Sequence, residues 1–234
     1  MERSLLQEQL VSLYLRLNGY FVSGFIVHAP SDSKQTNRTQ IDALAVRFPY
    51  NCEPERDINV SEFLQVPEAL TDILICEVKG GNKQLQFNES LRTNDSSIRS
   101  VLRWIGAFSE SDIDGLSSSL KQVMTPQMNG AQSTDFARIQ CPRNYQIRPI
   151  LFAPNRPKPR TRQLRYVCGN ELTHYVWQCL RPPTPRPSCT ERYDFGLWGP
   201  YQDLVGFFKK VPHEPSMSEI EKEFRATQDG KPVF

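Results

Sequence analysis

The sequence predicts an α/β protein in which helices flank a mixed central sheet. Residues 3–18 carry apolar side chains at helical spacing. Three apolar runs with the length of strands follow, at residues 20–27, 40–48 and 72–79. A helical pattern, another strand pattern and a further helical pattern come next. This order of helix, three strands, helix, strand and helix is typical of a layered α/β domain.

The first predicted helix covers residues 3–18. One apolar stripe runs along it and consists of Leu6, Leu10, Leu13 and Leu17. Val11 and Leu15 lie on another side, so we expect the helix to be covered on both flanks. Glu8 lies on that second side. Gly19 predicts the end of the helix, because glycine readily adopts the left-handed conformation of a C-terminal cap.

Three strands are predicted next. The first, at residues 20–27, has a glycine interruption, and the second alternates so that one face carries Asp42, Leu44, Val46 and Phe48. The third covers residues 72–79 and ends at Gly80-Gly81. Residues 49–71 between the second and third strands form a long connection with three prolines and a short helical pattern near 60–64.

The second half of the chain predicts a helix at about 96–109, with Trp104 in the core. The Ser/Gln-rich residues 110–145 predict a loop with a helical piece near 116–124. A strand at 147–153 and an apolar run at 164–167 lead to a helix for which Asn170 is the expected cap. The expected domains are one over residues 1–181, and a Pro-rich linker with a C-terminal helical extension over 182–234, with helices near 199–210 and 217–226.

Composition excludes several classes of protein. The chain of 234 residues is 38% hydrophobic with a net charge of +2, and no run is long and apolar enough for a membrane span. Met1 leads directly into an amphipathic helix rather than a secretory signal, so a cytoplasmic protein is expected. No nucleophile elbow, P-loop or dinucleotide-binding motif is present. The six cysteines form no Cys-x-x-Cys pair, which favours free thiols over a zinc set built from Cys168, His174, Cys179 and Cys189.

The triplet Glu77-Val78-Lys79 is the strongest chemical signal. It ends the apolar strand 72–79, and Asp42 lies in an earlier strand. The same acid-any-Lys pattern at 32–34 and 229–231 lacks this strand context. Two carboxylates beside an ammonium can hold a divalent cation and a water against a phosphodiester. The alternative is a structural ion pair, and burying such charges without a metal is costly.

These residues give specific chemical expectations. Asp42, Glu77 and the carbonyl of Val78 are the expected ligands of Mg²⁺, for which Mn²⁺ can substitute. Lys79 is expected to position the attacking water or to stabilise charge on the phosphorane. Glu8 supports a second metal or orients water if its helix packs over this edge of the sheet, and otherwise is a solvated helix residue.

The chain resembles the restriction-endonuclease-like PD-(D/E)xK nuclease superfamily over about residues 1–110. The matching segments are Glu8, Gly19–Val22, Gln40–Ala45 and Ile73–Lys79, and archaeal Holliday-junction resolvases and Mrr-type enzymes are similar there. The resemblance implies a restriction-endonuclease-like core of order αβββαβ with a C-terminal helical extension. It also implies an Mg²⁺-dependent endonuclease that acts on nucleic acid, DNA being favoured over RNA.

The chain departs from the pattern of this superfamily in three places. Gln40-Ile41 replaces a proline that often precedes the Asp, and the second helix lacks the Gln-x-x-Tyr signature of RecB-like members, which argues against that branch. Residues 182–234 lie outside the resemblance and match nothing in the family. The long connection 49–71 predicts an inserted hairpin or helix beside the site.

Further basic and C-terminal segments have two interpretations each. Arg156, Lys158, Arg160 and Arg162 form either a phosphate-contacting arm or a solvated loop. The helices near 199–226 either dock a partner protein or a second copy of the chain, or pack on the domain. The alternative function is a catalytically inactive nuclease-fold module that binds nucleic acid or a partner, or a subunit active only within a complex.

Overall fold

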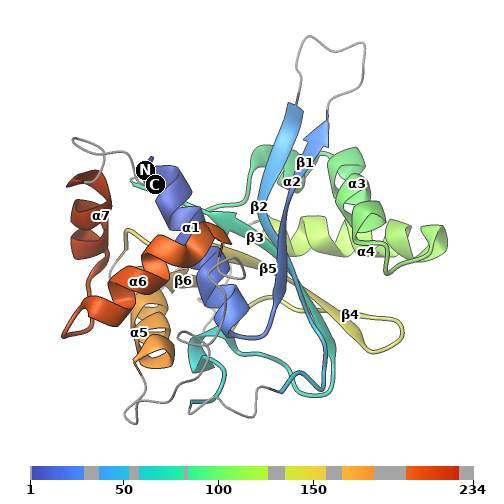
Figure 1. Ribbon diagram of the computed structural model, residues 1–234. Coiled ribbons are helices and arrows are strands. Elements are labelled where there is room, and N and C mark those ends of the chain that lie inside the picture. Colours follow the sequence, from blue (N-terminus) through green and yellow to red (C-terminus); the bar gives the residue numbers. More distant parts are fainter. Residues whose placement is uncertain are drawn as a thin grey trace.

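A mixed open sheet lies between two layers of helices (Figure 1). The computed structural model describes residues 2–28, 37–52, 58–81, 84–125, 135–156, 165–181 and 199–226. The strand order is β1 (Phe21–His28), β2 (Asn37–Arg47), β3 (Thr71–Val78), β5 (Tyr145–Ala153) and β4 (Ile139–Cys141), and β6 (Tyr166–Cys168) pairs with β5. The predicted α/β class with a mixed sheet is confirmed.

The pairing of β3 brings two segments distant in sequence to one edge of the sheet. β3 is antiparallel to β2, with Ala43 opposite Cys76, and parallel to β5, with Val78 opposite Phe152. β6 is also parallel to β5. Strands β3, β5 and β6 therefore end together, at residues 77–80, 153–156 and 168–169. We call this the carboxyl edge.

One face of the sheet is covered by α1 (Arg3–Leu17), α5 (Gly169–Leu180), α6 (Gln202–Lys210) and α7 (Met217–Ala226) (Figure 1). These helices and the sheet share one hydrophobic cluster, which includes Leu10, Leu13, Ala43, Leu74, Val176, Phe208 and Ile220. Val11 and Leu15 are buried too, which confirms that α1 is covered on both flanks. The C-terminal helices thus pack on the domain, as one of their two interpretations predicted.

The other face is covered by α2 (Glu89–Thr93), α3 (Asp95–Ile105) and α4 (Glu110–Met124). Helix α4 is longer than predicted, because a capping box of Ser109 and Asp112 starts it within the segment expected to be a loop. Strand β4 was not predicted. Trp104 was expected in the core but is 50% exposed, because α3 buries the side that carries Ile98, Val101 and Leu102.

Two local predictions were wrong. Asn170 does not cap α5; the cap is Cys168, whose backbone N–H donates to Glu171 Oε2 at 2.8 Å. The connection 49–71 contains the predicted short helix, η1 (Glu62–Leu64), but its described part lies at the start of β3 rather than beside Glu77. There the Leu64 carbonyl accepts a hydrogen bond from Arg148 Nη1 at 2.7 Å.

Across the described ranges, no helix has the length and apolarity that a membrane span requires. Cys52, Cys76, Cys141, Cys168 and Cys179 form no disulfide with one another in the part of the chain that the structure describes, and Cys76, Cys141 and Cys168 are buried. Cys189, the last member of the considered zinc set, and the Pro-rich segment 182–188 lie outside the described residues.

Candidate active site at the carboxyl edge

Glu77 brings a fully buried carboxylate to the end of β3. Strand alternation places it on the face that carries Ile73 and Ile75, under helices α2–α4. Its side chain is 0% exposed. The backbone N–H of Asn88 donates to both carboxylate oxygens, at 3.0 Å each. The carboxylate is therefore held from the side of α2.

Lys79 lies against this carboxylate, as the alternation of the triplet predicted. Its Nζ is 2.5 Å from Glu77 Oε2 and donates to Asn88 Oδ1 at 2.8 Å. Asn88 is the N-cap residue of α2 and contacts both members of the pair. The sequence analysis did not assign Asn88. Asparagine directly before Glu89 is typical of a helix N-cap, and that signal could have indicated its place.

Asp42 joins the pair from the neighbouring strand. The register of β2 with β3 runs as far as Ala43 opposite Cys76, which brings Asp42 to the end of β3. Asp42 Oδ2 accepts a hydrogen bond from the backbone N–H of Val78 at 2.7 Å. The two carboxylates thus lie on adjacent strands, as expected.

Glu8 lies within electrostatic range of Asp42. Partial burial raises the pKa of the Glu8 carboxyl, and the negative charge of Asp42 raises it further. The pKa of Glu77 is also raised, because its burial outweighs the opposing effects of Lys79 and the Asn88 N–H, with a further small increase from Asp42. Three of the four predicted catalytic residues are therefore carboxylates that influence one another.

The side chain of Gln7 packs α1 against the backbone of Gly80, directly after Lys79. A Cβ atom on Gly80 would lie 2.5 Å from Gln7 Oε1, so a larger residue at position 80 would force the Gln7 side chain to shift. Gln7 Nε2 donates to Asn155 Oδ1 at 3.0 Å. Asn155 Nδ2 is buried and has no hydrogen-bond partner among the described residues. The carboxyl edge therefore contains a donor that is not satisfied.

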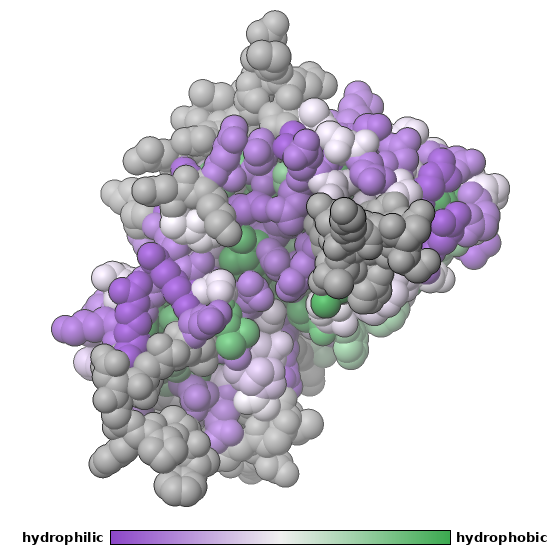
Figure 2. Space-filling view, turned by 90° about the horizontal axis from the view of Figure 1, so that it is seen from above, coloured by the Kyte–Doolittle hydropathy of each residue, from purple (hydrophilic) through white to green (hydrophobic). Residues whose placement is uncertain are grey.

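The basic stretch begins at this same edge. Arg156 directly follows Asn155, and its carbonyl accepts a hydrogen bond from the N–H of Gly169 at 2.7 Å. Lys158, Arg160 and Arg162 lie outside the described residues. In Figure 1 the arrow of β1 points upward. Strand β3 runs in the same general direction as β1, because both are antiparallel to β2, so the carboxyl edge is on the upper side. Seen from above, the surface is mainly hydrophilic, with a small hydrophobic area near its centre (Figure 2).

The donor chemistry of Asp42 and Glu77 fits Mg²⁺, which is bound through one or two carboxylates and keeps several waters. Within the described ranges, no group of three or more His, Cys, Asp or Glu side chains is gathered closely enough to hold a metal ion by itself. A cation here would therefore depend on this carboxylate pair, on backbone oxygen and on water.

The chain matches no protein-family model, no curated protein and no solved structure, so the arrangement of these residues is the basis of the functional argument.

Proposed function

We propose that the protein is an Mg²⁺-dependent endonuclease of the restriction-endonuclease-like PD-(D/E)xK type that hydrolyses phosphodiester bonds in nucleic acid, with DNA favoured over RNA. One observation carries the proposal. Asp42 Oδ2 accepts a hydrogen bond from the backbone N–H of Val78, the residue between Glu77 and Lys79, and Lys79 Nζ lies 2.5 Å from Glu77 Oε2. Two carboxylates and an ammonium are thereby held at one point of a sheet edge.

Burial of the pair supports a role beyond structure. The Glu77 side chain is 0% exposed and that of Lys79 only 11%. Removing two charges from water costs several kcal/mol per ion, and a buried pair often does not recover that cost. The pKa of Glu77 is raised even with Lys79 in contact, so the carboxylate is not fully compensated. A divalent cation would supply the missing positive charge.

The metal would be held by the carboxylates of Asp42 and Glu77 and by the carbonyl of Val78. When bound, Mg²⁺ or Mn²⁺ polarises the scissile phosphate and lowers the pKa of a coordinated water. Lys79 stabilises the negative charge that develops on the phosphate oxygens. Glu8, with its raised pKa, is suited to accept the proton of the water. The water oxygen bonds to phosphorus as the bond to the leaving oxygen breaks.

Two groups beside this point would bind the substrate backbone. Asn155 Nδ2 is a buried donor without a partner among the described residues, and a phosphate oxygen would satisfy it once the side chains that cover it move aside. Arg156 lies next to it at the carboxyl edge. Phosphate contacts of this kind position a strand without reading its sequence.

A second candidate function is a nuclease-fold module that binds without cutting. One observation favours it: both Glu77 oxygens already accept from the Asn88 N–H, and Lys79 neutralises one of them. A site completed in this way has no need of a cation. In that case no Mg²⁺-dependent cleavage occurs, whereas binding of nucleic acid or of a partner remains.

The deciding experiment is a cleavage assay with Mg²⁺ or Mn²⁺ on duplex, single-stranded and branched DNA and on RNA. Wild type, Lys79→Ala and Glu77→Ala are tested together with Lys121→Ala. Lys121 is the matched control, because it pairs with Asp95 on the exposed surface of α3 and α4. Cleavage by wild type and Lys121→Ala alone supports the proposal. Full activity in both site variants rejects it.

A further inference from the structure

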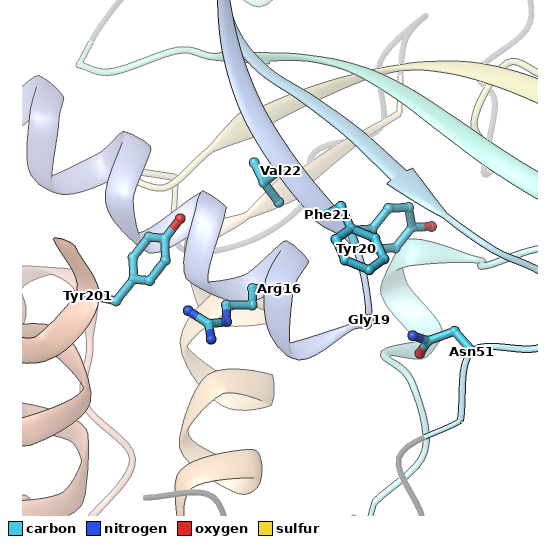
Figure 3. A pocket seen from close by; sticks show the side chains of 7 residues that line it. All are labelled: Arg16, Gly19, Tyr20, Phe21, Val22, Asn51 and Tyr201. Carbon is cyan, nitrogen blue, oxygen red and sulfur yellow. The ribbon is translucent and has the colours of Figure 1, made fainter. Parts of the chain in front are cut away.

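A pocket of about 370 Å³ lies where the end of α1 meets the start of β1 and the turn before α6, which is η3 (Gly199–Tyr201). It is lined by Arg16, Gly19, Tyr20, Phe21, Val22, Asn51 and Tyr201. Tyr201 stands on one side, Tyr20 and Phe21 stand on the other, and the side chain of Arg16 lies between them (Figure 3). None of the residues given for the Asp42–Glu77 site lines it.

The chemistry of the pocket fits a planar, negatively charged ligand. The guanidinium of Arg16 lies 5.9 Å from the centre of the Tyr201 ring, a cation–π distance. Arg47 lies close by, and its Nη2 donates to the Asn51 carbonyl at 3.1 Å. No carboxylate is among the described lining residues. Aromatic rings with a guanidinium and no acid are the combination that binds a base together with its phosphate.

The open side of α1 connects this pocket to the candidate active site. Glu8, Ser12 and Arg16 are each four residues apart, so they follow one another along the same side of the helix, and all three are partly exposed. Gln7, the residue before Glu8, lies against Gly80 directly after Lys79, so this end of α1 meets the candidate active site. Eight residues of α-helix span about 12 Å.

We infer that this pocket holds a nucleotide of the same strand that lies in the candidate active site. The base stacks on the aromatic walls that include Tyr201, and Arg16 contacts the adjacent phosphate. Because stacking requires an unpaired base, the inference assigns a single-stranded segment beside the cleavage point. This inference rests on the proposed function, because that function makes the bound strand the substrate. It adds that the substrate is single-stranded beside the cleavage point.

The test measures binding of a short single-stranded DNA by fluorescence anisotropy without divalent cations. Tyr201→Leu keeps apolar volume but removes the aromatic ring, and Arg16→Gln removes the charge. Tyr201→Leu is expected to weaken binding at least about fivefold, since stacking of one base contributes about 1–3 kcal/mol. Arg16→Gln is expected to weaken binding as well, through the lost phosphate contact. Trp104→Leu is the matched control, because Trp104 is a half-exposed aromatic residue of α3 in the opposite helix layer. Unchanged affinity in both pocket variants overturns the inference.

Salt dependence separates a phosphate contact from a structural effect. For Arg16→Gln, the slope of log affinity against log salt should become smaller by about 0.7, the value for one phosphate contact of a single strand. Tyr201→Leu should lose affinity with the slope unchanged, since its ring carries no charge. The same slope in wild type and Arg16→Gln contradicts a phosphate contact and overturns the assignment.

Two further arms identify the source of the ligand and separate this inference from the proposed function. The first arm measures the affinity for free adenosine monophosphate. If this affinity equals that for the single-stranded DNA and falls in Arg16→Gln, the ligand is a mononucleotide and the inference of a bound strand is overturned. A parallel assay measures Mg²⁺-dependent cleavage of the same DNA. If wild type binds the DNA through the pocket but does not cleave it, this inference is supported and the proposed function is rejected. Cleavage with an unchanged KM in Arg16→Gln removes this inference alone.

Discussion

Arg148 and Asp72 form an ion pair whose side chains are 0% and 1% exposed, with Nη2 2.5 Å from Oδ2. The pair joins β5 to β3. Arg148 Nε donates to Asp72 Oδ1 at 2.9 Å, and the Tyr20 hydroxyl donates to Oδ2 at 2.5 Å. The Leu64 carbonyl accepts from Nη1 at 2.7 Å. Both charges are thus satisfied inside the protein, at the end of β3 opposite to the candidate site.

Asp72→Ala should lower the free energy of unfolding by about 3–5 kcal/mol, because it leaves the Arg148 charge buried without its partner. Urea unfolding followed by circular dichroism measures this loss. Asp95→Ala removes the partner of exposed Lys121 and should cost only about 0–1 kcal/mol. Equal losses in the two variants would show that the buried pair does not hold β3 and β5 together.

Stability should depend on the ionisation of Glu77. Burial raises the folded-state pKa of Glu77 above its unfolded value of about 4.3. Between these two pKa values, the unfolded carboxyl loses its proton first, so rising pH favours the unfolded state. The free energy of unfolding of wild type relative to Glu77→Gln should therefore fall from pH 4 toward neutral pH in the absence of divalent cations.

Glu110→Gln provides the opposite control for this titration. A hydrogen bond from Arg103 lowers the pKa of the exposed Glu110 carboxyl, so its contribution to stability is lost as pH falls rather than as pH rises. Under the proposed function, added Mg²⁺ should reduce the trend seen with Glu77, since a cation favours the ionised carboxylate. A flat difference between wild type and Glu77→Gln across this pH range would contradict the raised pKa.

Lys79→Met should separate metal binding from hydrolysis. Loss of the ammonium is expected to lower the cleavage rate by about 10²–10³-fold, as loss of a charge-stabilising group does. Mg²⁺ affinity measured by calorimetry should stay the same or increase, because Lys79 no longer competes for Glu77 Oε2. Lys121→Met serves as the matched control. A Lys79→Met protein that cleaves normally would be incompatible with the assigned role.

Gly19→Ala should destabilise the protein and disturb the pocket together. Gly19 has a φ of +82°, and a Cβ atom there would lie 2.2 Å from Asn51 Oδ1. The left-handed conformation alone costs an alanine about 1–2 kcal/mol. Thermal unfolding measures the loss of stability. Gly115→Ala is the control, because nothing lies within 4 Å of a Cβ at that helical position; it should be neutral or slightly stabilising.

The parts of the fold that the sequence predicted are those with a strong period or a local stop signal. The leucine stripe and Gly19 predicted α1, and the alternation around Asp42 and Glu77 placed both acids on adjacent strands. Helix α4 was underestimated, because polar residues dilute its apolar positions Ile113, Leu116, Leu120 and Met124. Strand β4 has three residues, too few to show a period.

The missed members of the site are determined by tertiary contacts. Asn88 reaches Glu77 through its backbone N–H, which carries no signal in the residue type. Asn155 meets Gln7 across 148 residues of chain. The exposure of Trp104 also depends on tertiary packing. Its apolar side chain predicted a core position, but the orientation of α3 against the sheet leaves it half exposed.

The parallel pairing of β3 with β5 has a consequence for how the site forms. Asp72 and Arg148 are 76 residues apart, so β3 gains its second neighbour only after a long loop has closed. Glu8, Asp42, Glu77 and Lys79 all precede β5 in the chain, but the backbone N–H of Lys79 is held by the carbonyl of Phe152. During synthesis, a chain that has not reached β5 carries every proposed catalytic residue without the strand that fixes them. Activity should therefore emerge late in folding, with closure of the whole sheet.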